Sequence, residues 1–153
     1  MGQGRLTASA IISFSKELEE DTRRFYEEMA EAYPQGREAF LAFAKEAQKG
    51  WALISRTYQE TVSDAMETGF SFEGLDLTYY QAEKDMRAKG YVEALKKALK
   101  LEEAAVRFYS DAAERASSFL ATMPKAFRKV AEMREARRKR IQALLDNLGI
   151  RRD

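Results

Sequence analysis

The chain of 153 residues contains no cysteine and no histidine. The lack of cysteine excludes disulfides, thiolate metal sites and cysteine nucleophiles. The lack of histidine removes the commonest general base and the commonest transition-metal ligand. Any chemistry must therefore come from Asp, Glu, Lys, Arg, Tyr, Ser or Thr side chains.

Helix breakers and long apolar runs are also scarce. Two prolines and eight glycines leave room for long unbroken helices. No run of about 18 apolar residues is present, so we expect no membrane-spanning helix. The early apolar piece AIISF is short and is soon followed by the charged piece KELEE, which is not the pattern of a signal peptide. We therefore expect a cytoplasmic protein.

The residues that are present indicate a globular helical chain. Apolar residues make up 45% and charged residues 33% of the chain, which suits one domain over residues 1–153. The net charge of +1 gives no general attraction to nucleic acid or membrane. Apolar residues recur with helical spacing and predict four amphipathic helices, at about 8–33, 37–67, 90–117 and 124–148.

The links between these helices predict an all-α four-helix bundle. Pro34 and Gly36 end the first helix, Pro124 suits the start of the fourth, and Gly149 suits its C-terminal cap. The link between the second and third helices is long. It contains a predicted short helix at about 78–88, opened by a capping box from Thr78. Two antiparallel hairpins joined by such a crossover form a four-helix bundle.

One phrase occurs twice in the chain. LEEDTRRFY at residues 18–26 returns as LEEAAVRFY at residues 101–109, with six of nine positions identical. The two copies lie at matching places in the first and third helices. We therefore predict an internal duplication, in which one helical hairpin was copied to make the second.

Each copy places a glutamate within the apolar stripe. Glu19 shares a helix face with Thr22 and Tyr26, and Glu102 stands in the same relation to its neighbours. A carboxylate inside a bundle must be paired, protonated or bound to a metal. The alternative is that both glutamates lie at the edge of the stripe and reach water.

The repeated pattern E-x-x-[A/T]-x-x-F-Y resembles the rubrerythrin-like branch of the ferritin-like superfamily. It is matched by Glu19-Thr22-Phe25-Tyr26 and Glu102-Ala105-Phe108-Tyr109. The hairpins, the crossover and the F-x-x-[L/I/V/F]-A spacing extend the resemblance over nearly the whole chain. The resemblance implies two iron or mixed-metal ions, held by one Glu from each repeated helix and by a Glu-x-x-His pair from each other helix. It also implies peroxide reduction, iron oxidation or related oxygen chemistry.

The chain departs from this pattern in the second and fourth helices. Counting from Phe40, the expected Glu and His positions fall on Ala47 and Gly50. In the fourth helix they fall on Arg134 and Arg137. Both Glu-x-x-His pairs are therefore missing, and a one-residue shift that would use Glu46 moves the apolar stripe off the core.

We predict that arginine has replaced the metal. Arg134, together with Arg137, is expected to fill the position between Glu19 and Glu102, because a guanidinium meets a carboxylate in a planar, bidentate way. Tyr26 and Tyr109 are expected to line this site, either as its hydrogen-bonding partners or as plain core aromatics.

Three functions remain open from the sequence. The first is a non-catalytic binding or assembly module, expected to be a homodimer without a cofactor. The second is an oxidoreductase or metal-binding protein with an all-carboxylate iron or manganese site. Its ligands would be Glu19 and Glu102 with Glu46, Glu132 or Glu135. The third, nucleic-acid binding through the basic tract 134–140, is the weakest, because the tract suits a solvated helix face.

Overall fold

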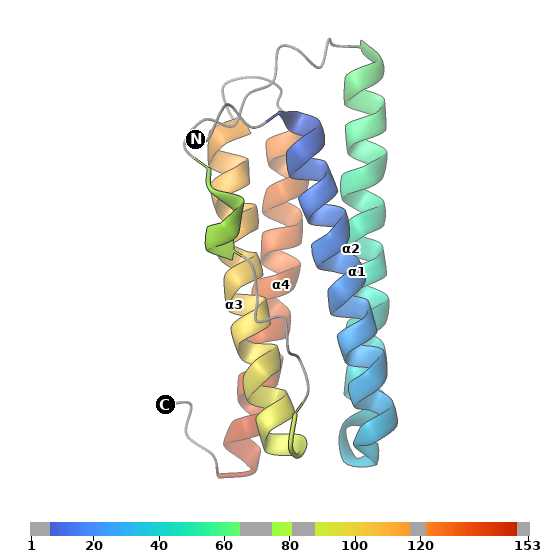
Figure 1. Cartoon of the computed structure of the whole chain (residues 1–153), viewed down its shortest axis with the longest axis vertical. Coiled ribbons are helices and arrows are strands. Elements are labelled where there is room, and N and C mark those ends of the chain that lie inside the picture. Colours follow the sequence, from blue (N-terminus) through green and yellow to red (C-terminus); the bar gives the residue numbers. More distant parts are fainter. Residues whose placement is uncertain (1–6, 65–74, 81–87, 117–121, 150–153) are drawn as a thin grey trace.

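The computed structural model describes residues 7–64, 75–80, 88–116 and 122–149. The described residues contain four long helices and no strand (Figure 1). The long helices are α1 (Ala8–Ala32), α2 (Arg37–Asp64), α3 (Tyr91–Ala116) and α4 (Thr122–Asn147). Two short 3-10 helices accompany them, η1 (Pro34–Gly36) and η3 (Leu77–Tyr80). The protein is therefore an all-α four-helix bundle, as predicted.

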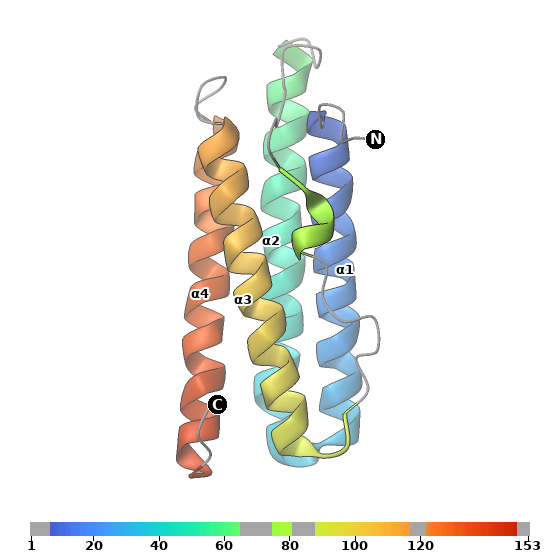
Figure 2. The same ribbon diagram turned by 60° about the vertical axis from the view of Figure 1, so that its left-hand side comes forward.

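The helices form two antiparallel hairpins. In Figure 1, α1 runs down the bundle and α2 returns, whereas α3 runs up and α4 returns. Each hairpin packs along its length, and α2 of the first hairpin packs against α4 of the second. Helices α1 and α4 consequently lie on opposite sides of the bundle (Figure 2). Because α2 ends at one end and α3 begins at the other, the link between the hairpins spans the bundle lengthwise.

Local sequence signals explain where the helices begin and end. The Thr7 hydroxyl accepts a hydrogen bond of 3.2 Å from the Ala10 N–H, which is an N-terminal cap of α1. Gly36 allows the tight turn into α2, since a Cβ there would lie 2.6 Å from the Tyr91 ring. Gly149 has φ +76°, the left-handed conformation that favours glycine after a helix.

The observed helix bounds lie close to the predicted ones. Helix α1 ends one residue earlier than expected, and α4 begins two residues earlier, at Thr122 rather than Pro124. The predicted short helix is different: its described part is the 3-10 helix η3, and residues 81–87 lie outside the described residues. At the start of η3 the Asp76 carboxylate accepts hydrogen bonds from the Thr78 N–H and hydroxyl. The predicted capping box of Thr78 involves Gln81, which lies outside the described residues.

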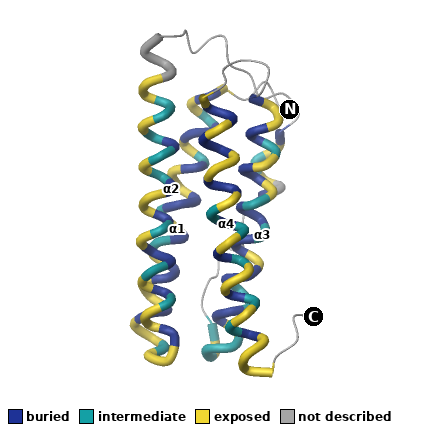
Figure 3. Tube along the Cα trace, turned by 180° about the vertical axis from the view of Figure 1, so that it is seen from behind, coloured by how far each residue is buried: buried dark blue, intermediate teal, exposed yellow. Residues whose placement is uncertain are grey.

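The core runs along the whole bundle. Buried residues face inward on all four helices, and exposed ones face outward (Figure 3). Aromatic rings form much of it, including ring contacts of Tyr26 with Phe40 and Phe43, and of Tyr109 with Phe108 and Phe127. No helix among the described residues is long and apolar enough to span a bilayer.

Candidate functional site

Four charged side chains lie at the centre of this apolar core. Glu19 is 2% exposed, Arg137 is 1% exposed, and Glu102 and Arg134 are fully buried. The alternative in which the two glutamates reach water is therefore wrong. Side chains of these types are almost never fully buried unless they are paired, so their partners define the site.

Arg134 lies between the two glutamates. Its Nη1 donates to Glu102 Oε1 at 2.8 Å, and its Nη2 donates to Glu19 Oε2 at 2.9 Å. Its Nε donates a longer bond of 3.3 Å to the same Glu19 oxygen. Nη2 also donates to the Thr22 hydroxyl at 2.9 Å, which in turn donates to the Leu18 carbonyl. One guanidinium from α4 thus binds carboxylates from both α1 and α3.

The two tyrosines of the repeated phrase bond crosswise to the two glutamates. The Tyr26 hydroxyl on α1 donates to Glu102 Oε2 on α3 at 2.5 Å. The Tyr109 hydroxyl on α3 donates to Glu19 Oε2 on α1 at 2.6 Å. The Ser15 hydroxyl lies 2.7 Å from the Tyr109 hydroxyl and donates to it, because the single proton of Tyr109 is given to Glu19. The tyrosines are therefore both core aromatics and hydrogen-bonding partners of the carboxylates.

Arg137 extends the network to α2 and the surface. Its Nη1 donates to both oxygens of Glu102, and its Nε donates to Glu46 Oε1 at 3.1 Å. The Glu46 side chain is 31% exposed and also accepts a 2.7 Å bond from Arg140. The Arg140 guanidinium stacks over the Phe43 ring, 4.8 Å from its centroid.

The network is neutral as a whole. It contains three carboxylates, from Glu19, Glu46 and Glu102, and three guanidiniums, from Arg134, Arg137 and Arg140. Burying an ion pair costs several kcal/mol of hydration per ion, and attraction offsets this only when the geometry is good and the remaining polar atoms are bonded. Matched charges and several direct hydrogen bonds meet most of that condition here.

The charges shift the pKa values of the buried groups. Burial alone raises the pKa of Glu102, but Arg134 and Arg137 outweigh it and hold this pKa below its usual value. Burial also lowers the pKa of Arg134, and the two glutamates more than compensate, so its pKa is raised. Burial, followed by the neighbouring carboxylate, raises the pKa of Tyr26 and of Tyr109 well above 10.0. At neutral pH the arginines are charged and the phenols are neutral donors.

Helix α2 leaves space where α4 provides its arginines. Ala47 is fully buried and Gly50 is buried, and neither carries a side chain beyond a methyl group. A Cβ built on Gly50 would lie 3.7 Å from Glu19 Oε1 and 3.6 Å from Val130, which are ordinary contact distances. Glu19 Oε1 accepts no hydrogen bond from the described residues, because the three donors of Glu19 all meet Oε2.

The site does not fit the two metal ions that the resemblance implies. The Arg134 guanidinium binds Glu19 Oε2 and Glu102 Oε1, so a cation already lies between the two carboxylates. Glu132 is exposed at the outer surface, and Glu135 pairs with Arg138. The described residues contain no group of three or more Asp, Glu, His or Cys side chains that could hold a metal ion. The alternative carboxylate ligand set therefore does not come together.

The sequence did not indicate every member of the network. Ser15 and Thr22 occupy small positions of the apolar stripe, and nothing in the pattern distinguished them from packing residues. Glu46 lies one position off the stripe, yet its side chain reaches Arg137. A useful signal was available for Arg140, since it follows Arg137 by three residues and so continues the same helix face.

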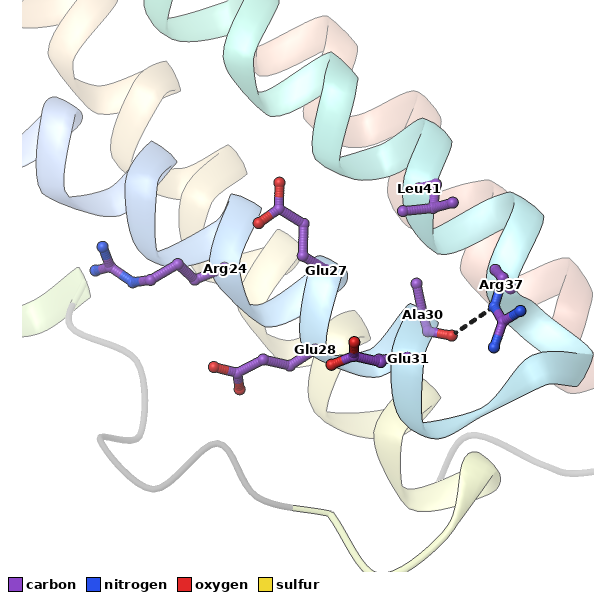
Figure 4. A pocket seen from close by; sticks show the side chains of 7 residues that line it. All are labelled: Arg24, Glu27, Glu28, Ala30, Glu31, Arg37 and Leu41. Carbon is purple, nitrogen blue, oxygen red and sulfur yellow. Dashed lines mark hydrogen bonds between the residues drawn. The ribbon is translucent and has the colours of Figure 1, made fainter.

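Two hollows on the outer surface are separate from this network. One, of ≈ 610 Å³, lies where α1 meets α2 and is shown in Figure 4. The other, of ≈ 520 Å³, lies between α2 and α4. Charged residues of both signs line each hollow. The first is lined by Arg24, Glu27, Glu28, Ala30, Glu31, Arg37 and Leu41.

Comparison with known proteins adds no family to these observations. No family model matches the chain, and no curated protein or solved structure matches it significantly. Function must therefore be argued from the fold and the buried network alone.

Proposed function

We propose that the protein is a diverged rubrerythrin-like bundle in which a guanidinium has replaced a di-metal site. In this proposal it acts as a non-catalytic binding or assembly module. The observation that carries the proposal is the position of Arg134, whose guanidinium donates to Glu19 and Glu102 at 2.9 and 2.8 Å. A cation already lies where a metal would need those oxygens.

The reciprocal tyrosine bonds support descent from a symmetric site. Tyr26 bonds the glutamate of the other hairpin, and Tyr109 does the same in return. A duplicated hairpin produces such a pair of equivalent bonds without further adjustment. The arginines come from α4 alone, as expected if they were acquired after the duplication.

The buried network also lacks what catalysis would require. Glu102 is fully buried, its charge is balanced by two guanidiniums, and both of its oxygens accept hydrogen bonds. A general base needs access to the proton that it removes and a pKa near the working pH. The arginines hold the pKa of Glu102 below its usual value, so this carboxylate is a poor base. Its role in the proposal is to hold the helices together.

Metal analysis tests the proposal against the oxidoreductase alternative. The protein is expressed in medium supplemented with iron and manganese, purified without chelator, and its metal content is measured by elemental analysis. We expect far less than one metal ion per chain. The matched variants are Glu19→Ala with Glu102→Ala, and Glu17→Ala with Glu20→Ala on the outer side of α1.

Stoichiometric metal that is lost only in the Glu19→Ala, Glu102→Ala variant would overturn the proposal. A second variant, Arg134→Ala, tests whether the guanidinium takes the place of a metal ion. Removal of the guanidinium leaves two carboxylates without their shared cation, and we expect Mn²⁺ binding to rise relative to the parent. Unchanged Mn²⁺ binding in a folded Arg134→Ala protein would show that the guanidinium is not a substitute for metal.

A further inference from the structure

The hollow between α2 and α4 is bordered by lysines and arginines. Three cations of α4 line this hollow of ≈ 520 Å³, and Leu53 of α2 lines it from the other helix. Lys49 lies one turn before Leu53 and Arg56 lies three residues after it, so both cations are on the Leu53 side of α2. All five cations are exposed. We call them the basic surface: Lys49, Arg56, Lys125, Arg128 and Lys129.

The cations of the basic surface are not neutralised within the chain. None of them forms an ion pair with another described residue. Glu60 and Glu132 also line the hollow, so five cations stand against two carboxylates. Lys125 lies three residues before Arg128 and four before Lys129, and like charges at this spacing destabilise a helix. An excess of positive charge therefore remains that no contact among the described residues explains.

The basic tract 134–140 does not supply this excess. Its first two arginines are buried in the network, while Arg138 and Arg140 each pair with a glutamate. Lys139 is exposed and forms no ion pair within the described part of the chain. The tract is therefore largely neutralised within the protein, and attraction to an anionic partner comes from the basic surface instead.

The bundle also separates its charges. Helix α1, on the opposite side from α4 (Figure 2), contains seven acidic and three basic residues, whereas α4 contains eight basic and three acidic ones. The net charge of +1 therefore conceals a positive side and a negative side. A polyanion is attracted to the α4 side and repelled from α1, so its approach is oriented.

The basic surface lacks the apolar groups that other anionic partners would need. Among the described residues the exposed large apolar side chains are Leu41 and Leu148, and neither lines the hollow between α2 and α4. Membrane surfaces take up exposed apolar side chains, protein interfaces centre on large anchor residues, and single strands stack on exposed aromatic rings. Exposed cations hold a lone small anion weakly. The phosphates of a double helix require only cations, and affinity grows with each phosphate that is contacted.

We propose that the basic surface binds the phosphate backbone of a double-stranded nucleic acid without reading its sequence. Lys49 and Arg56 are about 10 Å apart along α2, and a duplex carries about six phosphates over that length. Two helices side by side are about 20 Å across, whereas the major groove is about 12 Å wide, so α2 and α4 together do not fit into it. The contacts therefore stop at the backbone, which carries no sequence information.

This inference rests on the proposed function in taking the bundle as a binding module, and it names the partner. It makes no use of the buried network, since none of the five cations belongs to that network. Metal content and duplex binding can be measured on the same sample. Stoichiometric metal together with duplex binding would reject the metal replacement and keep this inference, whereas a metal-free protein that binds no duplex would do the reverse.

Removal of the cations from each helix tests the proposal. Each variant replaces exposed cations with glutamine: the α2 variant changes the two of α2, the α4 variant changes the three of α4, and the matched control changes three on α1 and α3. The substitutions are Lys49→Gln and Arg56→Gln; Lys125→Gln, Arg128→Gln and Lys129→Gln; and, in the control, Lys16→Gln, Lys100→Gln and Arg115→Gln.

Fluorescence anisotropy measures the binding of each protein to labelled duplexes of about 20 base pairs, as DNA and as RNA, from about 0.05 to 0.2 M NaCl. Duplexes of unrelated sequence are compared, and circular dichroism checks that each variant is helical. We expect the parent to bind unrelated sequences equally. The logarithm of its association constant should fall against the logarithm of salt concentration with a slope of about −4, because each phosphate contact contributes about −0.9.

The α2 variant should reduce the steepness of this slope by about 2 and the α4 variant by about 3, and each should bind at least about tenfold more weakly at the lowest salt. The control should bind within about twofold of the parent, because distant exposed charges are screened. Absence of binding by the parent at about 0.1 mM protein and the lowest salt would overturn the proposal. Equal weakening in the control, or a parent that binds phosphatidylglycerol vesicles but no duplex, would also overturn it.

Discussion

The two hairpins each provide a glutamate and a tyrosine to the site, but they differ in the residues that face the glutamates: small ones from α2 and arginines from α4. Helices α1 and α3 each give a glutamate and a tyrosine at matching positions of the repeated phrase. At the corresponding positions of the other helices, α2 gives Ala47 and Gly50, whereas α4 gives Arg134 and Arg137. The likeness between the two hairpins therefore extends to the carboxylates but not to the groups that face them.

This difference shows how a buried pair of like charges can be held without a metal. Glu19 and Glu102 need positive charge between them, and two arginines from one helix supply it. Arginine side chains are long, and the small residues of α2 leave the volume that they fill. Two further arginines from α2 would overfill the core and would leave buried positive charge without a partner.

The largest expected effect comes from removing the central cation. Arg134→Ala leaves two buried carboxylates without their shared donor, and we expect a loss of about 3–5 kcal/mol in the free energy of unfolding. Urea denaturation followed by circular dichroism measures it. Urea is preferable to guanidinium chloride, since a free guanidinium ion could enter the emptied site.

Arg138→Ala is the matched control for this substitution. Arg138 lies one turn further along α4 and pairs with Glu135, but its side chain is 23% exposed and that of Glu135 is 38% exposed. Exposed pairs of this kind contribute about 0–1 kcal/mol. A loss below about 0.5 kcal/mol in Arg134→Ala as well would mean that the buried pair does not stabilise the fold.

The second prediction moves the cation to the other hairpin. Ala47 is the counterpart of Arg134, so Ala47→Arg in the Arg134→Ala background should place a guanidinium near the same two glutamates from the opposite side. We expect the double variant to be more stable than Arg134→Ala by about 1–2 kcal/mol, although Ala47→Arg alone should destabilise the parent by overpacking and excess charge.

A double-mutant cycle over the four proteins gives the coupling free energy between positions 47 and 134. A favourable coupling above about 1 kcal/mol would show that the two positions are interchangeable, as the predicted duplication implies. Additive losses would instead mean that the halves have diverged too far for α2 to present a guanidinium to the glutamates. The control Ala47→Met adds a long side chain without a charge, so its effect on the free energy of unfolding separates added volume from added charge.

How far the sequence could predict these features depends on what periodicity measures. Helical spacing locates backbone positions, so it predicted the four helices. The meeting of Arg134 with Glu19 and Glu102 was predicted by counting along the pattern of the family that the chain resembles. Periodicity does not give the reach of a long side chain. For that reason the sequence named Glu46 only as an alternative metal ligand and did not predict its bond to Arg137.

The other misses have local causes. Thr22 and Ser15 are small enough to be counted as packing residues, and only their hydroxyl bonds in the folded chain mark them as part of the network. The short helix after residue 77 was expected to be α-helical from Thr78. Its described part, Leu77–Tyr80, is a 3-10 helix, at whose start the Asp76 carboxylate bonds Thr78, and residues 81–87 lie outside the described residues.

The third prediction concerns the unequal surroundings of the two glutamates. Both buried arginines donate hydrogen bonds to Glu102, whereas only one of them, Arg134, donates to Glu19. The arginines hold the pKa of Glu102 in the folded chain below its usual value. The stability that this carboxylate contributes is therefore fully present above its unfolded pKa of about 4.3, and it is lost as pH falls through the folded pKa.

Urea denaturation from pH 7 to pH 3 measures this loss, which cannot exceed about 1.4 kcal/mol per pH unit for one proton. In Glu102→Gln the slope below about pH 4.3 should be smaller than in the parent. Glu135→Gln is the control: a hydrogen bond from Arg138 lowers the pKa of Glu135, but this carboxylate is at the surface, so its removal should change the slope much less. Equal slopes in the parent and Glu102→Gln would show that Glu102 does not retain its charge through the arginines.

The smallest effect tests whether the space on α2 is needed. Gly50 lies inside a helix, and a Cβ there would meet Val130 and Glu19 only at ordinary contact distances. Gly50→Ala should therefore stabilise the protein by about 0.5–1 kcal/mol, through the lower entropy of the unfolded chain. Gly36→Ala is the opposite case, because its Cβ would approach the Tyr91 ring to 2.6 Å and should destabilise the protein. If Gly50→Ala is instead destabilising, the unbonded oxygen of Glu19 must use that space, and the α2 half of the site holds something that a methyl group displaces.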